Sequence, residues 1–308
     1  MGKETPSSHH SEERLRLELK SGLDRSLQWL AVNRHEFAFT QDTNWHEQIF
    51  LMKPFAEFVL ALRVLNRLGH DVADHVKWAW ELTRNGDYLL DVLVARPDLA
   101  SLAGLYASFH EFGYRNSRLR AWLTHLESMT SINAAESSLW SRIADKYNFQ
   151  RLGLGEPPDQ LMSQSWLESD PEPWTISDAS AYSVTHEVFY ITDFGCRADS
   201  LSVKATELLN LWLPVWVRCF ADEQNWDIVG ELLMVAICIK DSSWTGQLLL
   251  QMLKTQSEDG MFSGPAGAGR GLVNPTNSPA RQRFLSNYHT TIVGSMALAM
   301  YLQLAQHD

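Results

Sequence analysis

Apolar residues recur every three or four positions along nearly the whole chain, and this spacing is the feature that most limits its fold. Phe55, Phe58, Leu62 and Leu65 show the pattern clearly, and Gly69 follows them as a suitable helix C-cap. Strand signals are nearly absent, because Val, Ile and Thr rarely alternate with polar residues between turn sequences. The sequence therefore predicts an all-α protein.

Two irregular stretches interrupt this helical pattern. Residues 153–181 contain a cluster of prolines, and residues 260–284 are rich in Gly, Pro and Asn. We expect residues 1–12 to form a disordered tail, since they are polar and lack the apolar period. We expect residues 13–308 to form a single helical domain in which the two stretches are long loops. Paired helices of this kind close into a ring or stack in an open solenoid, and periodicity alone allows both.

Composition limits the partners that such a chain can bind. The net charge of -11 repels nucleic-acid backbones and anionic lipid, so we expect a small-molecule partner, no nucleic acid and no membrane. No apolar run reaches the roughly 18 residues of a membrane span, and the first residues lack the apolar core of a secretory signal. Three scattered cysteines favour a reducing compartment, so we expect a cytoplasmic protein. The oligomeric state does not follow from the sequence.

Residues 256–262 read QSEDGMF and follow an amphipathic helix that contains Trp244 and Leu253. This segment resembles the QxxDGxW repeat of the terpenoid cyclase and protein prenyltransferase superfamily, with Phe262 in place of Trp. The resemblance implies an α/α toroid in which the Gln caps a helix end, the Asp-Gly pair turns the chain, and the aromatic ring packs on the next helices. Local chemistry agrees, because Asp-Gly favours turns and Gly frees the backbone.

Residues 287–291 read NYHTT, and we expect them to open the last helix. They resemble the YHT segment of protein prenyltransferase β subunits, in which the His is a zinc ligand. The resemblance therefore implies that His289 binds zinc. Those enzymes also take ligands from an Asp-Gly-Cys sequence, whereas this chain has Met261 at the position of the Cys. Because Met is a poor zinc ligand, protein prenylation is disfavoured.

The densest group of polar and aromatic residues lies between Tyr182 and Cys196. If this segment is helical throughout, His186 and Asp193 are seven residues apart and share one face. A histidine beside a carboxylate forms an oriented general base or part of a metal site, and Tyr190 or Tyr182 can donate a proton. The alternatives are that His186 is a cap or a core residue and that residues 193–195, Asp-Phe-Gly, end a helix.

The toroid resemblance also implies that helix starts converge at one end of a central cavity, which would bring these segments together. Asp259 would then lie near them. The candidate catalytic residues are His186, Tyr190, Asp193 and His289. The candidate metal ligands, with zinc as the metal, are His186, Asp193 and His289. The candidate substrate-binding residues are His110, Trp174, Tyr182, Phe189 and Tyr288.

These observations predict an enzyme that acts on a small molecule in a toroid cavity. Metal-dependent or acid–base chemistry would promote cyclisation, elimination or hydrolysis, as in specialised metabolism. The sequence has no DDxxD diphosphate motif and no DxDD proton donor, so cyclisation of a terpene by protonation is unsupported. The alternative is a non-catalytic helical binding or scaffold protein with the same fold.

Overall fold

The computed structural model describes residues 6–39, 45–269, 272–273 and 276–304. Helices form its regular structure, which confirms the all-α prediction. The described residues contain no β-strand, only an isolated bridge between Gln256 and Phe262. Among the described helices, none is both long and apolar enough to cross a membrane.

The chain divides into two compact units. The expectation of a single domain over residues 13–308 stays a prediction. We call them the terminal unit, which contains Met1–Glu36 and Asn210–Asp308, and the middle unit, which contains Phe37–Leu209. The boundary falls within α10 (Val203–Asp222).

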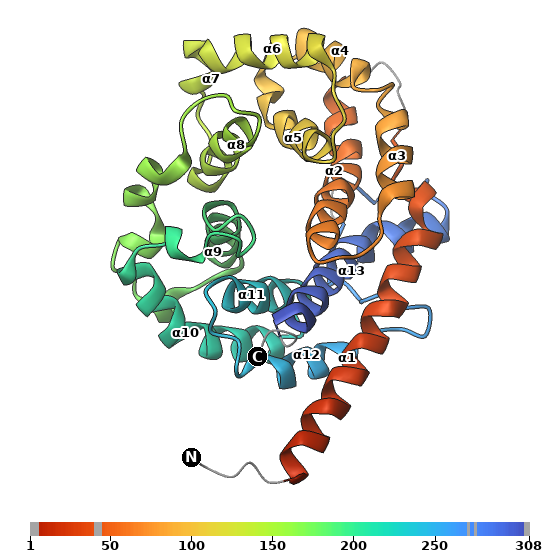
Figure 1. The fold of residues 1–308 in the computed structure, drawn as a ribbon, viewed down its shortest axis with the longest axis vertical. Coiled ribbons are helices and arrows are strands. Elements are labelled where there is room, and N and C mark those ends of the chain that lie inside the picture. The colour runs from red at the N-terminus through yellow and green to blue at the C-terminus, as the bar shows by residue number, and fades with distance from the viewer. Residues whose placement is uncertain (1–5, 40–44, 270–271, 274–275, 305–308) are drawn as a thin grey trace. The chain divides into compact units, whose positions relative to one another are not determined.

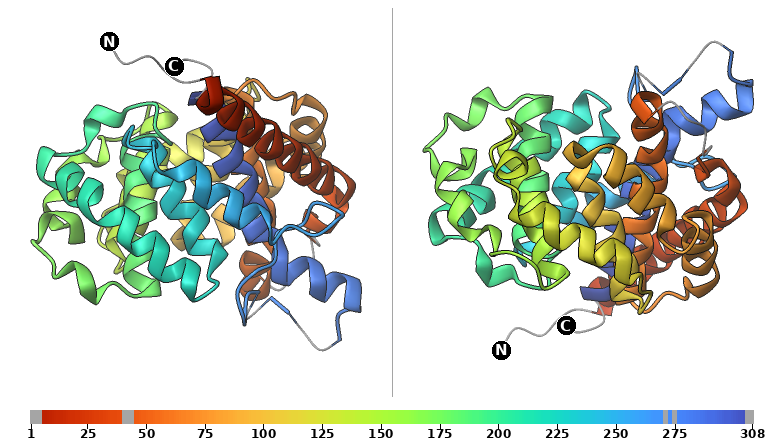
Figure 2. Two further views of the ribbon diagram at one scale, coloured as in Figure 1. Left: turned by 90° about the horizontal axis from the view of Figure 1, so that it is seen from below. Right: turned by 90° about the horizontal axis from the view of Figure 1, so that it is seen from above.

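The terminal unit is built around α13, its most buried long helix. α13 packs against α1 and α11, and α12 packs against all three of these helices (Figures 1 and 2). Every residue of α11 is buried, so this helix forms the core of the unit. The bounds are α1 (Pro6–Val32), α11 (Trp226–Cys238), α12 (Thr245–Leu253) and α13 (Pro279–Leu304).

The middle unit contains a row of neighbouring helices, in which α2 packs on α5, α5 on α8, and α8 on α9 (Figure 1). Shorter helices accompany this row, since α3 packs on α2 and α4 packs on α6. The bounds are α2 (Trp45–Arg67), α3 (Ala73–Leu82), α4 (Asp87–Ala95), α5 (Ala103–Glu111), α6 (Ser117–Ser128), α7 (Thr130–Asn133), α8 (Leu139–Arg151) and α9 (Asp178–Ile191).

Short 3-10 helices connect these elements. They are η1 (Arg34–Phe37), η2 (Pro97–Leu102), η3 (Pro158–Gln164), η4 (Trp166–Glu168), η5 (Pro173–Thr175) and η6 (Ala198–Ser200). The long connection expected at residues 153–181 therefore contains η3, η4 and η5 and ends in the capping box formed by Ser177 and Ser180 at the start of α9.

Two helices begin earlier than the sequence analysis predicted. α1 begins at Pro6, so residues 6–12 are helical rather than a disordered tail, and residues 1–5 lie outside the described residues. α13 begins at Pro279 rather than at Tyr288, and the expected loop at 260–284 ends correspondingly sooner. The reason is local: proline suits the first turn of a helix, and the Ser278 hydroxyl accepts a hydrogen bond from the Arg281 amide.

Candidate metal centre

Two acidic residues and one histidine meet where α11 packs against α13. Asp227 and Glu231 are four residues apart, so they lie on the same face of α11. His289 extends from α13, and its Nε2 lies 3.5 Å from Asp227 Oδ2 and 3.4 Å from Glu231 Oε1. One ligand atom from each of the three residues can be chosen so that all lie within 4.8 Å of one another.

The two carboxylates are unusual because they are buried: every residue of α11 is buried, and Asp227 and Glu231 are its acidic residues. Asp227 and Glu231 are each 3% exposed, and an ionised carboxylate removed from water costs free energy unless a cation or hydrogen-bond donors compensate it. Two acids on one face of a core helix therefore require compensation by a cation or by hydrogen-bond donors.

Thr290 fixes the orientation of one carboxylate. Its Oγ1 donates a 2.8 Å hydrogen bond to Asp227 Oδ1, which leaves Oδ2 of the same carboxylate directed towards His289. Thr290 is itself buried on α13, directly after His289 in the chain. Hydrogen bonds of this kind orient metal ligands and are an integral part of metal sites.

The donor set fits a zinc ion. Ligand atoms about 2.0–2.1 Å from zinc in tetrahedral coordination lie about 3.3 Å apart, close to the 3.5 Å and 3.4 Å that separate His289 Nε2 from Asp227 and Glu231. Imidazole and carboxylate are both common zinc ligands. The His289 side chain is 30% exposed, so one side of the cluster is accessible to solvent.

Only one member of this cluster was predicted from the sequence. The YHT resemblance predicts His289 as a ligand at a helix start, whereas His289 lies in the third turn of α13. Asp227 and Glu231 were missed because they carry no recognised motif. The signal that could have found them is their four-residue spacing within an otherwise apolar helix.

The structure does not pair His186 with Asp193. The helical spacing that suggested this pair is broken, since α9 ends at Ile191 and Asp193 has a φ of 49°. Phe194 and Gly195 also have positive φ, so residues 193–195 turn the chain after the helix, as the alternative interpretation held. His186 lies among aromatic rings: its ring is 4.8 Å from that of Trp140, and its Nδ1 is 2.8 Å from the carbonyl oxygen of Tyr182.

Asp193 instead belongs to an arginine cluster in the middle unit. Its Oδ1 accepts hydrogen bonds from Arg63 Nη2 at 2.5 Å and from the hydroxyl of Tyr147, and it lies 2.9 Å from Arg67 Nη1. Glu111 joins the same cluster, because it binds Arg63, Arg67 and Arg151. We call this group, Arg63, Arg67, Glu111, Tyr147, Arg151 and Asp193, the arginine cluster.

The charges of the arginine cluster hold its acids in the ionised state. Burial alone would raise the pKa of Glu111, but the guanidinium of Arg63 and that of Arg151 lower it to about 2. Burial also acts to raise the pKa of Asp193, and Arg63 and Tyr147 outweigh it, so that this pKa lies below its usual value. Both acids are therefore structural ion-pair partners at neutral pH, which argues against Asp193 as a proton carrier or metal ligand.

The comparison with known families gives one match. The family model described as a domain of unknown function, DUF6895, matches residues 23–299. The chain belongs to this family. The matched range includes Asp227, Glu231 and His289 as well as the arginine cluster. No curated protein and no solved structure matches the chain.

The remaining candidate residues of this DUF6895 chain have mixed positions. Tyr288 is buried and stacks on Phe284 with ring centroids 5.5 Å apart, and Phe189 is buried and stacks on Phe194, so both pack in cores. Tyr190 lies against Tyr147, and Tyr182 contacts the ring of His186. The last two candidates lie elsewhere: the side chain of Trp174 is 73% exposed on η5, and His110 lies in the last turn of α5.

The QSEDGMF segment of the DUF6895 chain forms a tight turn in the terminal unit. Gln256 Nε2 donates hydrogen bonds to the carbonyl oxygens of Gly22 on α1 and Gly260 in the turn. Phe262 is buried, and its amide donates to Thr291 Oγ1 on α13. Asp259 accepts hydrogen bonds within the turn and pairs with Arg283 at 2.9 Å. It is therefore a turn residue and is not part of the cluster around His289.

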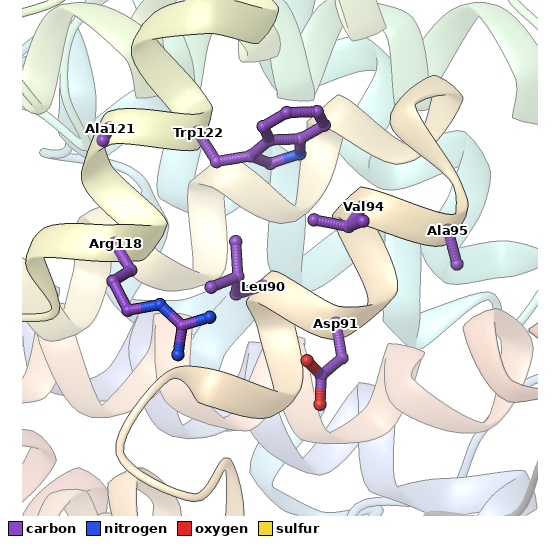
Figure 3. Close-up of a pocket in the computed structure, with 7 residues that line it drawn as sticks. All are labelled: Leu90, Asp91, Val94, Ala95, Arg118, Ala121 and Trp122. Carbon is purple, nitrogen blue, oxygen red and sulfur yellow. The ribbon is translucent and has the colours of Figure 1, made fainter.

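A shallow pocket of about 630 Å³ lies between α4 and α6 in the middle unit (Figure 3). Its walls are largely apolar, with Val94 and Leu90 on one side and Trp122 on the other. Asp91 is already paired with Arg84. No cluster of groups suited to catalysis lines this pocket.

Proposed function

We propose that this DUF6895 protein is a zinc-dependent hydrolase of a small molecule, with Asp227, Glu231 and His289 as the metal ligands. The observation that carries the proposal is the spacing of their three ligand atoms at a place where two carboxylates are buried. Three protein ligands leave a fourth position for water or substrate, as in catalytic zinc sites. A zinc ion held by these residues would supply a bound water with a pKa of about 7 and would polarise a carbonyl or phosphoryl oxygen of the substrate.

The residues around the ligands have separate tasks in this proposal. Asp227 and Glu231 supply two negative charges that balance the charge of a divalent cation. Thr290 holds the Asp227 carboxylate in one orientation, and the exposed edge of His289 leaves the site open to a substrate. Hydrolysis is favoured over cyclisation or elimination because the donor set is suited to activating water.

We further propose that the fold is an α/α toroid. The C-terminal ends of α2, α5, α8 and α9 meet in the arginine cluster, so these neighbouring helices run in the same direction. Toroids and open solenoids both use such a layer of parallel helices. The turn formed by residues 256–262 supports the toroid in two respects, because Asp259 and Gly260 turn the chain and Phe262 packs against α13. Gln256 differs from the motif, since its side chain bonds Gly22 inside α1 rather than a helix end. We also propose that the protein is cytoplasmic, because its three cysteines, Cys196, Cys219 and Cys238, are free thiols.

Hydrolysis of an activated ester, p-nitrophenyl acetate, provides the test. The protein is stripped of metal with a chelator and assayed before and after addition of zinc. We expect zinc to restore a rate that chelation removes, and we expect His289→Ala to respond to neither treatment. His35→Ala is the matched control, because the side chain of His35 is 74% exposed, lies 3.4 Å from the carboxylate of Glu36, and does not belong to the candidate metal centre. Equal rates with and without zinc would support the non-catalytic alternative.

A further inference from the structure

A second pocket, of about 920 Å³, lies in the middle unit. It is bounded by η2, by α7 and by one face of α8, and it shares no residue with the arginine cluster or with the candidate metal centre. Its volume falls within the range of about 300–1,000 Å³ that is usual for small-molecule sites. Nothing in the proposed hydrolase chemistry uses this pocket.

The pocket has an apolar wall and a polar wall. Met129, Ile132 and Phe149 provide apolar surface, and the Phe149 ring is 6% exposed. Ser101, Ser137 and Ser141 provide hydroxyl groups. A ligand with a hydrocarbon body and one polar end matches this division.

Asp145 is the polar residue that distinguishes the pocket. It is partly buried on α8, and no other described residue forms a hydrogen bond or an ion pair with it. Burial raises the pKa of this carboxyl group to about 6. A carboxylate in this setting is costly without a partner, and a shifted pKa in a cavity is typical of a functional group.

The charges around Asp145 favour a cation. Acidic side chains from four different segments line the pocket in addition to Asp145: Asp98 on η2, Glu127 on α6, Glu136 in the loop before α8 and Glu156 in the loop after it. Two basic side chains, Arg142 and Lys146, line it from α8 itself. The Arg142 guanidinium is directed to Gln164, to which its Nη1 donates a 3.3 Å hydrogen bond.

We propose that this pocket binds an organic amine, with the ammonium group paired to Asp145 and the hydrocarbon body against Ile132 and Phe149. A metal ion is a poorer match, because Asp145 does not belong to a group of three closely spaced ligands among the described residues. An anion is disfavoured by the excess of carboxylates. The pocket thus binds its ligand by one charge-assisted hydrogen bond and by apolar contact.

Three probes of similar shape and different charge test this assignment: phenethylammonium, 2-phenylethanol and 3-phenylpropanoate. Calorimetric titration of the full-length protein at pH 7.5 is expected to show saturable binding of the amine at millimolar concentration. The alcohol and the carboxylate are expected to bind about tenfold more weakly or not at all, because they lack the charge-assisted contact. Absence of amine binding, or binding of either other probe with equal affinity, would overturn the proposal.

Two variants locate the binding site. Asp145→Asn keeps the shape of the side chain and removes its charge, so amine affinity should fall about tenfold or more. Glu136→Gln changes an exposed acid at the rim of the same pocket and should leave the affinity nearly unchanged. Equal losses in both variants would indicate only a general attraction between a cation and an acidic surface.

The pH dependence supplies an independent readout. The amine stays protonated near neutral pH, so binding should weaken as the pH falls through about 6, where Asp145 becomes neutral. The other charged groups facing the pocket are Asp98, Glu127, Glu136, Arg142, Lys146 and Glu156. The Asp145→Asn variant should lose this dependence, and its persistence in the variant would assign it to those other groups and contradict the proposal.

Discussion

Gly260 occupies a backbone position in the terminal unit that a larger residue cannot share. Its φ is 94°, and a Cβ placed on it would lie 2.1 Å from the carbonyl oxygen of Arg25. We predict that Gly260→Ala lowers the free energy of unfolding by about 2–4 kcal/mol, because it combines backbone strain with a clash against main chain. Denaturant unfolding measures this loss.

Gly69→Ala is the matched control for that prediction. Gly69 has a similar φ of 86°, but a Cβ there would have no atom within 4 Å. Its substitution should therefore cost only about 1 kcal/mol, from the strained backbone alone. Equal losses in the two variants would show that the contact with α1 is unimportant.

Thr290 and Thr291 are adjacent buried residues on α13 with different partners. The Thr290 hydroxyl donates to Asp227, whereas the Thr291 hydroxyl bonds the backbone of Phe262. We predict that Thr290→Val weakens zinc binding about tenfold, since an orienting hydrogen bond of a ligand is lost. Thr291→Val should destabilise the protein and leave zinc affinity unchanged. Zinc titration of both variants decides the matter, and equal affinities would contradict the assigned role of Thr290.

The residues of the candidate metal centre show what the sequence could and could not reveal. His289 was found because it lies in a recognisable segment. Asp227 and Glu231 were not found, because their importance depends on burial and on the neighbouring helix, which periodicity does not report. Asp193 was misassigned for a related reason: two non-glycine residues with positive φ end α9, and the sequence suggested a longer helix.

At the scale of elements, Arg63 joins the ends of helices that are distant in sequence. It lies near the end of α2 and binds Glu111 at the end of α5 and Asp193 just after α9. Its side chain is only 1% exposed. Cations near helix C-termini also interact favourably with the helix dipoles. The arginine cluster thus ties neighbouring helices of the middle unit together.

We predict that Arg63→Met lowers the free energy of unfolding by about 3–5 kcal/mol, because it leaves two partly buried carboxylates without their main partner. Arg84→Met is the control, since the ion pair of Arg84 with Asp91 is about half exposed and should contribute less than about 1 kcal/mol. Urea denaturation compares the two variants. A loss in Arg63→Met no larger than in the control would show that the arginine cluster is not a structural centre.

Glu111 makes the stability of this cluster dependent on pH. Its pKa in the folded protein is about 2, below the ordinary value of 4.5. Its contribution to stability is therefore fully present above about pH 4.5 and is lost as the pH falls towards 2. We predict that Glu111→Gln is less stable than the wild type at pH 7, and that the difference shrinks as the solution is acidified. Unfolding curves that stay equally far apart from pH 7 to pH 3 would contradict this assignment.

Element boundaries were partly predictable. Helix existence followed from apolar spacing, as Phe55, Phe58, Leu62 and Leu65 of α2 show. The start of α13 did not, because the polar sequence RQRFLSNY has no strong apolar face, and its helix depends on the Ser278-Pro279 start. The packing order of the helices could not be predicted from the sequence either, because it depends on contacts between distant residues, such as the ion pair of Arg63 on α2 with Glu111 on α5.

For the whole molecule, the chain is an all-helical member of the DUF6895 family with two compact units. The toroid and the hydrolase activity are our proposals, and the hydrolase activity centres on Asp227, Glu231 and His289 in the terminal unit. If zinc binds the folded protein alone, a concentration of about 100 times its dissociation constant stabilises the protein by about 2.7 kcal/mol. We predict that zinc raises the midpoint of thermal unfolding of the wild type and not that of Glu231→Gln. A shift of equal size in both proteins would place the bound zinc elsewhere.

The zinc content of the purified, tag-free protein is the most direct test of the central claim. Elemental analysis after dialysis against zinc and then against buffer should give about one zinc per chain in the wild type and in His35→Ala. His289→Ala and Glu231→Gln should lose it while they keep the helical circular dichroism of the wild type. A wild type without bound zinc, or full zinc retention in both of these variants, would contradict the proposed metal centre.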